Sequence, residues 1–200
     1  MAVTASILSR PTYGTLSPQP GRHHLFVADA DGAEPILRLK GEAPEGFWAG
    51  AHIIYVPGPG AQAHLEALRA LKPGFLHESP TIAAALPRLR QTLANAHMGL
   101  RVYLAGTEGL IGQAMQPVME AGVDHDAIQT EHAGSLKRRV QCVHCKGVTE
   151  DVTVSPVTCS HCGLLLFVRD HYSRRLAAFQ GVCVNAEDNR EIPCSEELYP

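Results

Sequence analysis

Two pairs of cysteines are the residues whose type and spacing most clearly indicate chemistry. Cys142 and Cys145 form one Cys-x-x-Cys pair, and Cys159 and Cys162 form a second pair shortly after it. Two residues between cysteines allow a tight turn to aim both sulfur atoms at one ion, and four thiolates complete a tetrahedron. The spacing therefore predicts a metal site with these four cysteines as its ligands.

The metal predicted for this site is zinc. Four thiolates leave no open coordination position, so a zinc ion here would be structural. Iron in the same geometry would be a one-electron carrier of the rubredoxin kind. Zinc is favoured because neither pair is followed by the aromatic residues expected around a redox iron. Gly147 and Gly163 are placed to take the positive φ of the two turns, and His144 and His161, inside the pairs, are expected to point outward.

Composition places the chain among ordinary globular proteins. It has 200 residues, 45% of them hydrophobic, and a net charge of −3, which argues against general nucleic-acid binding. No apolar run has the length of a membrane span, and no secretory signal is recognisable, so a cytoplasmic protein is expected. Four of six cysteines in metal spacing fit a reducing compartment. Cys183 and Cys194 are interpreted as spectators by default, with additional ligands or a disulfide pair as the alternatives. The eleven histidines are scattered and are expected to be surface or core residues.

Alternating strand and helix patterns predict an α/β domain with a small parallel sheet. The expected strands are compact apolar runs at 52–56, 74–77 and 101–105, with a last one beginning at Ile128. The expected helices are 61–71, a second helix that begins after Ser79 as its N-cap and ends at about Met98, and a third at 110–120. Two shorter apolar pieces, 24–27 and 35–39, are interpreted as possible strands around a turn at 29–32.

Glycine-rich turns follow two of the expected strands and are weak candidates for cofactor binding. In parallel sheets, ligands bind at the carboxyl ends of strands, where backbone N–H groups can meet an anion. The candidates are Gly58, Gly60, Gly106 and Thr107. Because the chain has no Gly-x-Gly-x-x-Gly motif, the interpretation that these glycines only make sharp turns is preferred.

Four regions are predicted along the chain: an N-terminal arm at 1–21, the α/β domain at 22–135, a four-cysteine metal ribbon at 136–186, and a poorly ordered acidic tail at 187–200. The basic run 136–139 is interpreted as a solvated linker, and strands at 164–168 and 175–184 are expected to flank a turn at 170–173. The basic and aromatic stretch 169–175 is expected to be an exposed hairpin, with a protein partner favoured over nucleic acid.

Part of the α/β region resembles the pyridine-nucleotide domain of ferredoxin reductase-type flavoenzymes. The resemblance lies in the strand 101–106, the turn at 121–123 and the strand ending near Glu131. Ala105 stands where that family has a cysteine beside the nicotinamide, and Thr107 where it has a proline. The resemblance implies a reductase-like scaffold without cofactor chemistry of its own.

The C-terminal block resembles the small subunit of bacterial dimethylamine monooxygenase, the DmmA-like family. The similar segments are 140–145, 156–159 and 166–179, and the order of domains fits from about residue 20 to 188. This resemblance implies a multisubunit enzyme of bacterial methylated-amine metabolism that converts dimethylamine to methylamine and formaldehyde. Its partner subunits would be a haem-containing oxygenase and a reductase with FMN and an iron–sulfur cluster, supplied by NADPH.

The sequence therefore predicts an accessory or assembly subunit that is not catalytic on its own. One alternative is a rubredoxin-like electron carrier between reductase and haem oxygenase, which visible colour and a reversible bleach would reveal. Another is a zinc-ribbon protein that binds nucleic acid, with a steep salt dependence. A weak nucleotide binder, stabilised by NADPH or a mononucleotide, is a further alternative.

Overall fold

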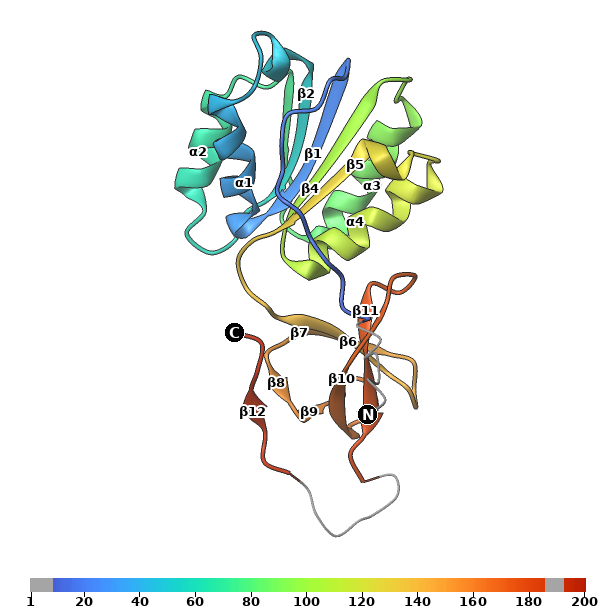
Figure 1. Ribbon diagram of the computed structural model, residues 1–200. Helices are drawn as coiled ribbons and strands as arrows, with labels where there is room; N and C mark the ends of the chain where they lie inside the picture. The colour runs from blue at the N-terminus through green and yellow to red at the C-terminus, as the bar shows by residue number, and fades with distance from the viewer. Residues whose placement is uncertain (1–8, 186–192) are drawn as a thin grey trace, which may run out of the picture. The chain divides into compact units, whose positions relative to one another are not determined.

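The computed structural model describes residues 9–185 and 193–200 (Figure 1). These residues form two compact units, one of residues 13–135 and one of residues 9–12 together with 136–185 and 193–200. Within the described residues, no helix is both long enough and apolar enough to cross a membrane. Each unit has its own core, and each is described separately below.

The unit of residues 13–135 is built on a parallel sheet of five strands, which confirms the predicted fold class. The strands are β1 His23–Asp29, β2 Ala51–Val56, β3 Phe75–Glu78, β4 Leu100–Gly106 and β5 Ile128–His132. Their order is β3-β2-β1-β4-β5, and all pairings are parallel. This is the order of dinucleotide-binding α/β sheets, in which the strand order reverses between β1 and β4 while all strands stay parallel.

Among the described residues, four α-helices cover the sheet, two on each face (Figure 1). One face carries α1 Ala33–Arg38 and α2 Gln62–Ala70; the other carries α3 Ile82–Ala94 and α4 Glu108–Glu120. The connections include the 3₁₀ turns η1 Ala30–Gly32, η2 Leu39–Gly41, η3 Phe47–Gly50 and η4 His125–Ala127. Successive residues of a strand point to opposite faces of the sheet, and helices cover both faces, so the side chains of the central strands are buried on both sides.

The two faces form two separate hydrophobic cores. Phe26, Tyr55 and Tyr103 point to the core under α1 and α2, where the Phe26 and Tyr103 rings stack 4.4 Å apart. Val27 and Leu104, one residue along, point to the core under α3 and α4. Burial of these side chains, at roughly 1.5–3 kcal/mol each, holds the helices on the sheet.

Two local predictions in this unit were wrong. Residues 35–39 were expected to form a strand, but they continue α1 and η2, since Pro35 lies in the first helical turn, where its missing N–H costs nothing. The N-cap of α3 is Thr81 rather than Ser79, and the Thr81 side chain accepts a hydrogen bond from the Ala84 N–H. Ser79 is instead buried.

Residues 13–21 have no helix or strand, as predicted for the arm, but they pack along the sheet. The Gly14 N–H donates to the Thr130 carbonyl, and the Leu16 N–H donates to the Glu131 carboxylate across 2.6 Å. Leu16 is 2% exposed. Glu131 also pairs with Arg38 at 2.6 Å, so one carboxylate fixes both the arm and α1. The first eight residues of the predicted arm lie outside the described residues.

The second unit is a β structure around the cysteines. Its five-stranded sheet has the order β7-β6-β11-β10-β9, and a two-stranded sheet pairs β12 with β8. The strands are β6 Arg138–Cys142, β7 Val148–Val152, β8 Val154–Ser155, β9 Val157–Thr158, β10 Leu165–Ser173, β11 Ala178–Cys183 and β12 Glu196–Glu197. β10 and β11 form the expected hairpin, but its turn follows Ser173 rather than lying at 170–173.

The basic run and the end of the chain are structured, contrary to prediction. Residues 138–139 begin β6, and the Arg138 side chain is only 6% exposed. Arg138 lies between the rings of Phe179 and Tyr199, 3.8 and 3.9 Å from their centroids. The acidic tail was expected to be poorly ordered; its described part, 193–200, instead forms β12 and buries Tyr199. The rest of the predicted tail, 187–192, lies outside the described residues.

Candidate functional site

The four cysteines come from two turns that face each other. Cys142 ends β6 and Cys145 lies in the turn before β7, while Cys159 and Cys162 lie between β9 and β10. Each turn is closed by a backbone hydrogen bond: Lys146 N–H to the Cys142 carbonyl at 2.9 Å, and Gly163 N–H to the Cys159 carbonyl at 3.0 Å. The sequence thus brings all four predicted ligands to one place.

The two turns solve the same backbone problem with different residues. Gly163 has the predicted positive φ, 75°. In the first turn the positive φ belongs to Lys146, at 64°, and not to Gly147 as predicted. Gly147 is needed for another reason, because a Cβ there would lie 2.4 Å from Cγ of His161. That histidine is exposed and its Nε2 lies 3.0 Å from the Val148 carbonyl.

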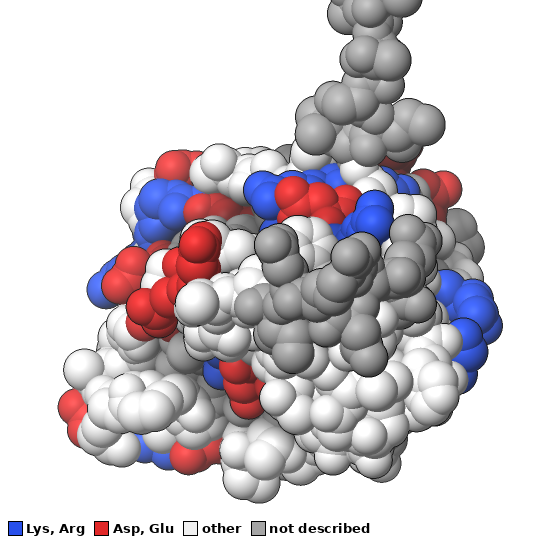
Figure 2. Space-filling model, turned by 90° about the horizontal axis from the view of Figure 1, so that it is seen from below, with Lys and Arg blue, Asp and Glu red and all other residues white. Residues whose placement is uncertain are grey.

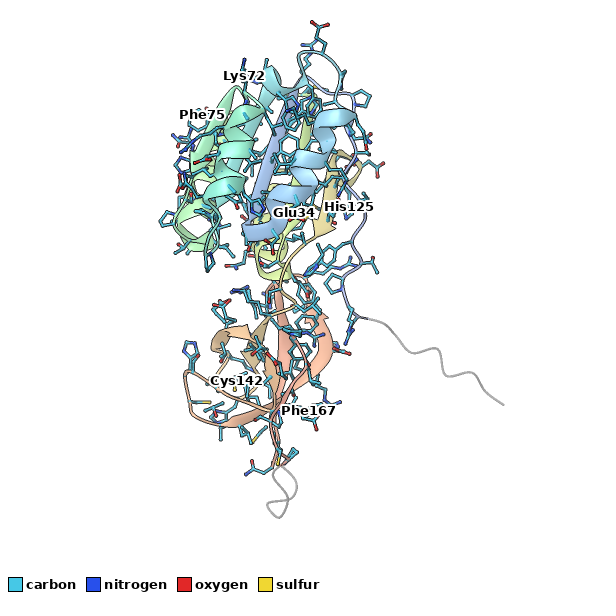
Figure 3. The ribbon with its side chains drawn as sticks, turned by 90° about the vertical axis from the view of Figure 1, so that its left-hand side faces the viewer. Glu34, Lys72, Phe75, His125, Cys142 and Phe167 are labelled. Carbon is cyan, nitrogen blue, oxygen red and sulfur yellow. The ribbon has the colours of Figure 1, made fainter. Side chains whose placement is uncertain are left out.

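The sulfur positions fit a tetrahedral ion. All four Sγ atoms lie within 4.8 Å of one another. The separations are 3.8 Å between Cys142 and Cys162 and 3.7 Å between Cys145 and Cys159. A regular tetrahedron with metal–sulfur bonds of about 2.3 Å has edges of about 3.8 Å. The two measured edges therefore match a four-thiolate site, and Figure 3 shows Cys142 within this unit.

The sulfur atoms interact strongly enough to perturb each other's ionisation. Burial raises the pKa of Cys159, but N–H groups of Cys162 and His161 that donate to its sulfur lower the pKa overall, to about 6. For Cys162, the Leu164 N–H lowers the pKa, while burial and the three other sulfur atoms raise it overall, to about 12. Four thiolates at this spacing need a cation to remain ionised together.

The cluster is buried on one side and accessible on the other. Cys142 and Cys159 are buried in the hydrophobic core of the unit, next to Val140 and Leu166. Cys145 and Cys162 are half-buried at its edge. Of the other two cysteines, Cys183 donates to Asn185 Oδ1 at 3.0 Å and Cys194 is exposed; neither belongs to the cluster.

The weak candidate residues for cofactor binding lie at the carboxyl end of the parallel sheet. Asp29, the last residue of β1, meets Thr107, the N-cap of α4, at the point where the strand order reverses. The Thr107 N–H donates to Asp29 Oδ1 at 2.8 Å, and the Thr107 hydroxyl donates to Oδ2 at 2.6 Å. Both residues are buried. The Thr107 N–H and hydroxyl, which could otherwise meet a ligand phosphate, are therefore bonded within the fold.

The glycines at this end permit close backbone contact. Gly106 has φ of 127° and faces the Asp29 carboxylate, which would collide with any Cβ. A Cβ on Gly32 would lie 2.3 Å from the Ala105 carbonyl oxygen. A Cβ on Gly58 would contact the Cβ of Ala30 at 2.8 Å, whereas Gly60, at φ 75°, has open space. Sequence reasoning assigned residues 29–32 to a turn and did not anticipate the role of Asp29.

Comparison with known proteins identifies the family. Residues 5–128 match the family described as dimethylamine monooxygenase subunit DmmA-like, N-terminal domain, and residues 139–182 match its C-terminal domain. The chain belongs to the DmmA-like family. It is also 33% identical over 145 residues to the heme-dependent oxidative N-demethylase delta subunit of Ectopseudomonas mendocina (strain ymp), covering 70% of this chain and 82% of that protein.

Solved structures with a similar fold are much more distant from this DmmA-like chain. Phthalate dioxygenase reductase is 14% identical, with 66% of this chain and 44% of that chain covered and a TM-score of 0.44. The FAD/NAD-binding domain of nitric oxide dioxygenase from Vibrio cholerae is 17% identical, with 62% and 56% covered and a TM-score of 0.41. The chain thus spans less than two thirds of either one. The fold class itself follows from the order and parallel pairing of the strands.

Proposed function

We propose that this chain is an accessory, assembly subunit of a multisubunit oxidative N-demethylase. The observation that carries the proposal is its 33% identity to a delta subunit of a heme-dependent N-demethylase, over 82% of that protein. The two family domains extend the similarity over both units. In this proposal the chain joins the subunits that carry out the reaction and does not itself bind the amine.

The proposed complex has two kinds of partner, which carry the cofactors. One is a haem-containing oxygenase subunit that activates oxygen. The other is a flavin and iron–sulfur reductase subunit that takes electrons from NADPH. The proposed reaction is the oxidative demethylation of dimethylamine to methylamine and formaldehyde. The bonded and buried Asp29–Thr107 contact weighs against the nucleotide-binding alternative, since it uses groups at the end of the sheet where parallel α/β sheets bind ligands.

The proposed role of the metal is structural. Cys142, Cys145, Cys159 and Cys162 would hold one zinc ion, which supplies charge neutralisation and a fixed tetrahedral junction. The unit has a small core of eight buried residues, which include the ligands Cys142 and Cys159. A domain of this size generally requires a metal or a disulfide for stability. Metal binding would therefore supply much of its folding free energy.

Reconstitution tests the assembly role. The haem and reductase subunits are purified with and without this chain, and formaldehyde formation and NADPH oxidation with dimethylamine are measured. We expect the chain to co-purify with both partners, and its omission to lower coupled turnover at least tenfold. The Cys159→Ser variant should behave like omission, whereas Cys183→Ser, the same change outside the cluster, should not. Equal assembly and turnover without the chain would refute the proposal.

An electron-transfer role is the second candidate, and one observation favours it. Cys145 and Cys162 are half-buried at the edge of the cluster, so a redox metal there would lie near the surface. On the face shown in Figure 2, Lys and Arg side chains are interspersed with Asp and Glu rather than gathered in a basic patch. This pattern gives the nucleic-acid alternative no support on that face. Iron at the cluster would decide for electron transfer.

A further inference from the structure

The two ends of the parallel sheet differ in charge. At the carboxyl end of the strands, Asp29 ends β1 and Asp31 follows it. Glu34 and Glu108 lie in the first turns of α1 and α4. Carboxylates there repel a ligand phosphate, although helix N-termini usually attract one. The amino end of the strands has the opposite character, because imidazole and guanidinium groups gather around a cavity.

This cavity, of about 400 Å³, opens at the starts of β1, β2 and β4 beside the second half of α3. Histidines come to it from three separate segments, namely His23 and His24 on β1, His52 on β2, and His97 before β4. Arg88 reaches it from α3. None of the described residues that line it is Asp or Glu. Its volume is in the range of small-molecule sites.

Two nitrogen atoms of the lining have unmet hydrogen-bonding capacity. His52 Nε2 and Arg88 Nε are both shielded from solvent, and neither has a hydrogen-bond partner among the described residues. Buried polar groups are nearly always hydrogen-bonded, so an exception indicates a ligand or water. Arg88 Nε can only donate, and His52 Nε2 donates in the matching tautomer. Each of the two atoms therefore still lacks an acceptor among the described residues.

The positive charge of Arg88 is held at the cavity without a carboxylate. Its Nη1 donates to Gln91 Oε1 at 3.2 Å, and its guanidinium carbon lies 4.7 Å from the centre of the Phe75 ring. The same ring packs edge-on against His52, with 4.5 Å between centroids. Phe75, labelled in Figure 3, is 41% exposed, and its ring contacts both side chains. No ion pair joins Arg88 to a carboxylate in the part of the chain that the structure describes.

We propose that this cavity binds a small organic oxyanion, a carboxylate or a phosphate ester, whose acidic group contacts Arg88 and His52. A guanidinium group pairs with either anion by charge-assisted hydrogen bonds. Leu25 and Leu100, which also line the cavity, provide an apolar wall for the rest of the molecule. A metal ion does not fit, because among the described residues only the four cysteines bring three or more ligand groups within reach of one ion.

Bound anion would change the ionisation of the histidines. Burial, then the charges of Arg88 on α3 and His77 on β3, lower the pKa of His52 to about 4. Burial, then His23 and Arg101, lower the pKa of His24. An anion beside Arg88 offsets its charge, so occupancy raises the pKa of His52. This shift is a readout independent of any enzymatic activity.

The experiment follows the imidazole signals of the full-length chain by NMR while inorganic phosphate, acetate or neutral acetamide is added at pH 7. We expect phosphate or acetate, but not acetamide, to move the His52 signals saturably and to raise its pKa. A response to phosphate alone selects phosphate esters, and a response to acetate alone selects carboxylates. Arg88→Gln should weaken binding at least tenfold, whereas Arg90→Gln, an exposed arginine on the same helix, should leave it unchanged.

The fold of each variant is checked by the emission of Trp48, the single tryptophan. If Arg88→Gln does not fold, His52→Gln serves as the second variant; its binding is followed by the signals of His24, which also lines the cavity, and should weaken similarly. The proposal is overturned if neither anion moves the His52 signals, if acetamide acts equally, or if Arg90→Gln weakens binding as much as the cavity variant does.

Discussion

Replacing Thr107 with valine tests whether the carboxyl end of the sheet is held closed by the chain itself. Valine has the shape of threonine but lacks the hydroxyl, which makes two hydrogen bonds. It donates to Asp29 Oδ2 at 2.6 Å and accepts from the Leu110 N–H at 3.3 Å as the N-cap of α4. Thr107 is 5% exposed, so water cannot readily replace either bond.

The expected loss follows from these two bonds. A hydrogen bond to a charged group contributes roughly 1.5–3 kcal/mol, and an N-cap contributes about 1 kcal/mol. Thr107→Val should therefore lower the free energy of unfolding by roughly 2.5–4 kcal/mol. Thr81 is the matched control: it caps α3 by accepting from the Ala84 N–H, and its hydroxyl makes no bond to a carboxylate among the described residues. Thr81→Val should cost only about 1 kcal/mol.

The assay is urea denaturation followed by Trp48 fluorescence. Trp48 is the single tryptophan and stacks on Phe26 in the core of the α/β unit, 5.7 Å between centroids, so it reports on that unit. Thr107→Ser, which keeps the hydroxyl, should remain near wild type. If Thr107→Val costs no more than Thr81→Val, the contact with Asp29 does not stabilise this end of the sheet and the reasoning fails.

Three further predictions concern the metal-binding unit. Cys159→Ser, or removal of metal by a chelator, should abolish metal binding and the strand signal of this unit in circular dichroism, but leave the tryptophan transition of the α/β unit in place. Cys183→Ser should change neither signal. Loss of both signals together would contradict independent folding of the two units. Tyr199→Ala removes a ring stacked on Arg138 and should destabilise the unit by roughly 2–4 kcal/mol, measured by chelator-free thermal unfolding; an unchanged midpoint would show that the chain end is dispensable. Burial raises the pKa of Asp170, but the two arginines that contact it lower that pKa overall. The ionised carboxylate therefore stabilises the fold above the ordinary aspartate pKa, and this stabilisation is lost as pH falls through the pKa of Asp170 in the folded state. Asp170→Asn should make the free energy of unfolding depend less steeply on pH on the acid side, and an equally steep dependence would count against this pairing.

The sequence predicted the features that depend on local pattern. Apolar runs such as 52–56 and 101–105 specify buried parallel strands, and the Cys-x-x-Cys spacing brought four sulfur atoms together. Features that depend on distant partners were missed. Arg138 was predicted to lie in a solvated linker. The local sequence does not show that it is buried, because the ring that covers it belongs to Tyr199, far along the chain. Position within the sheet, not local sequence, likewise makes Asp29 a partner of Thr107.

The scattered histidines illustrate the same limit. His23, His52 and His97 have no shared spacing, so no motif links them. They meet because parallel strands all begin at the same edge of the sheet, and the loop after α3 returns to that edge. A pattern search over strand starts, made after the strands were assigned, could have found this group.

Metal content with an absorption spectrum tests the central claim most directly. The full chain is expressed in medium that contains both zinc and iron, purified without a tag, and analysed for both metals. The account predicts one zinc per chain and a colourless solution, which makes the four-cysteine site structural and the subunit's role assembly. One iron per chain, with thiolate-to-metal bands that bleach reversibly on reduction, would contradict it and place the site on the electron path.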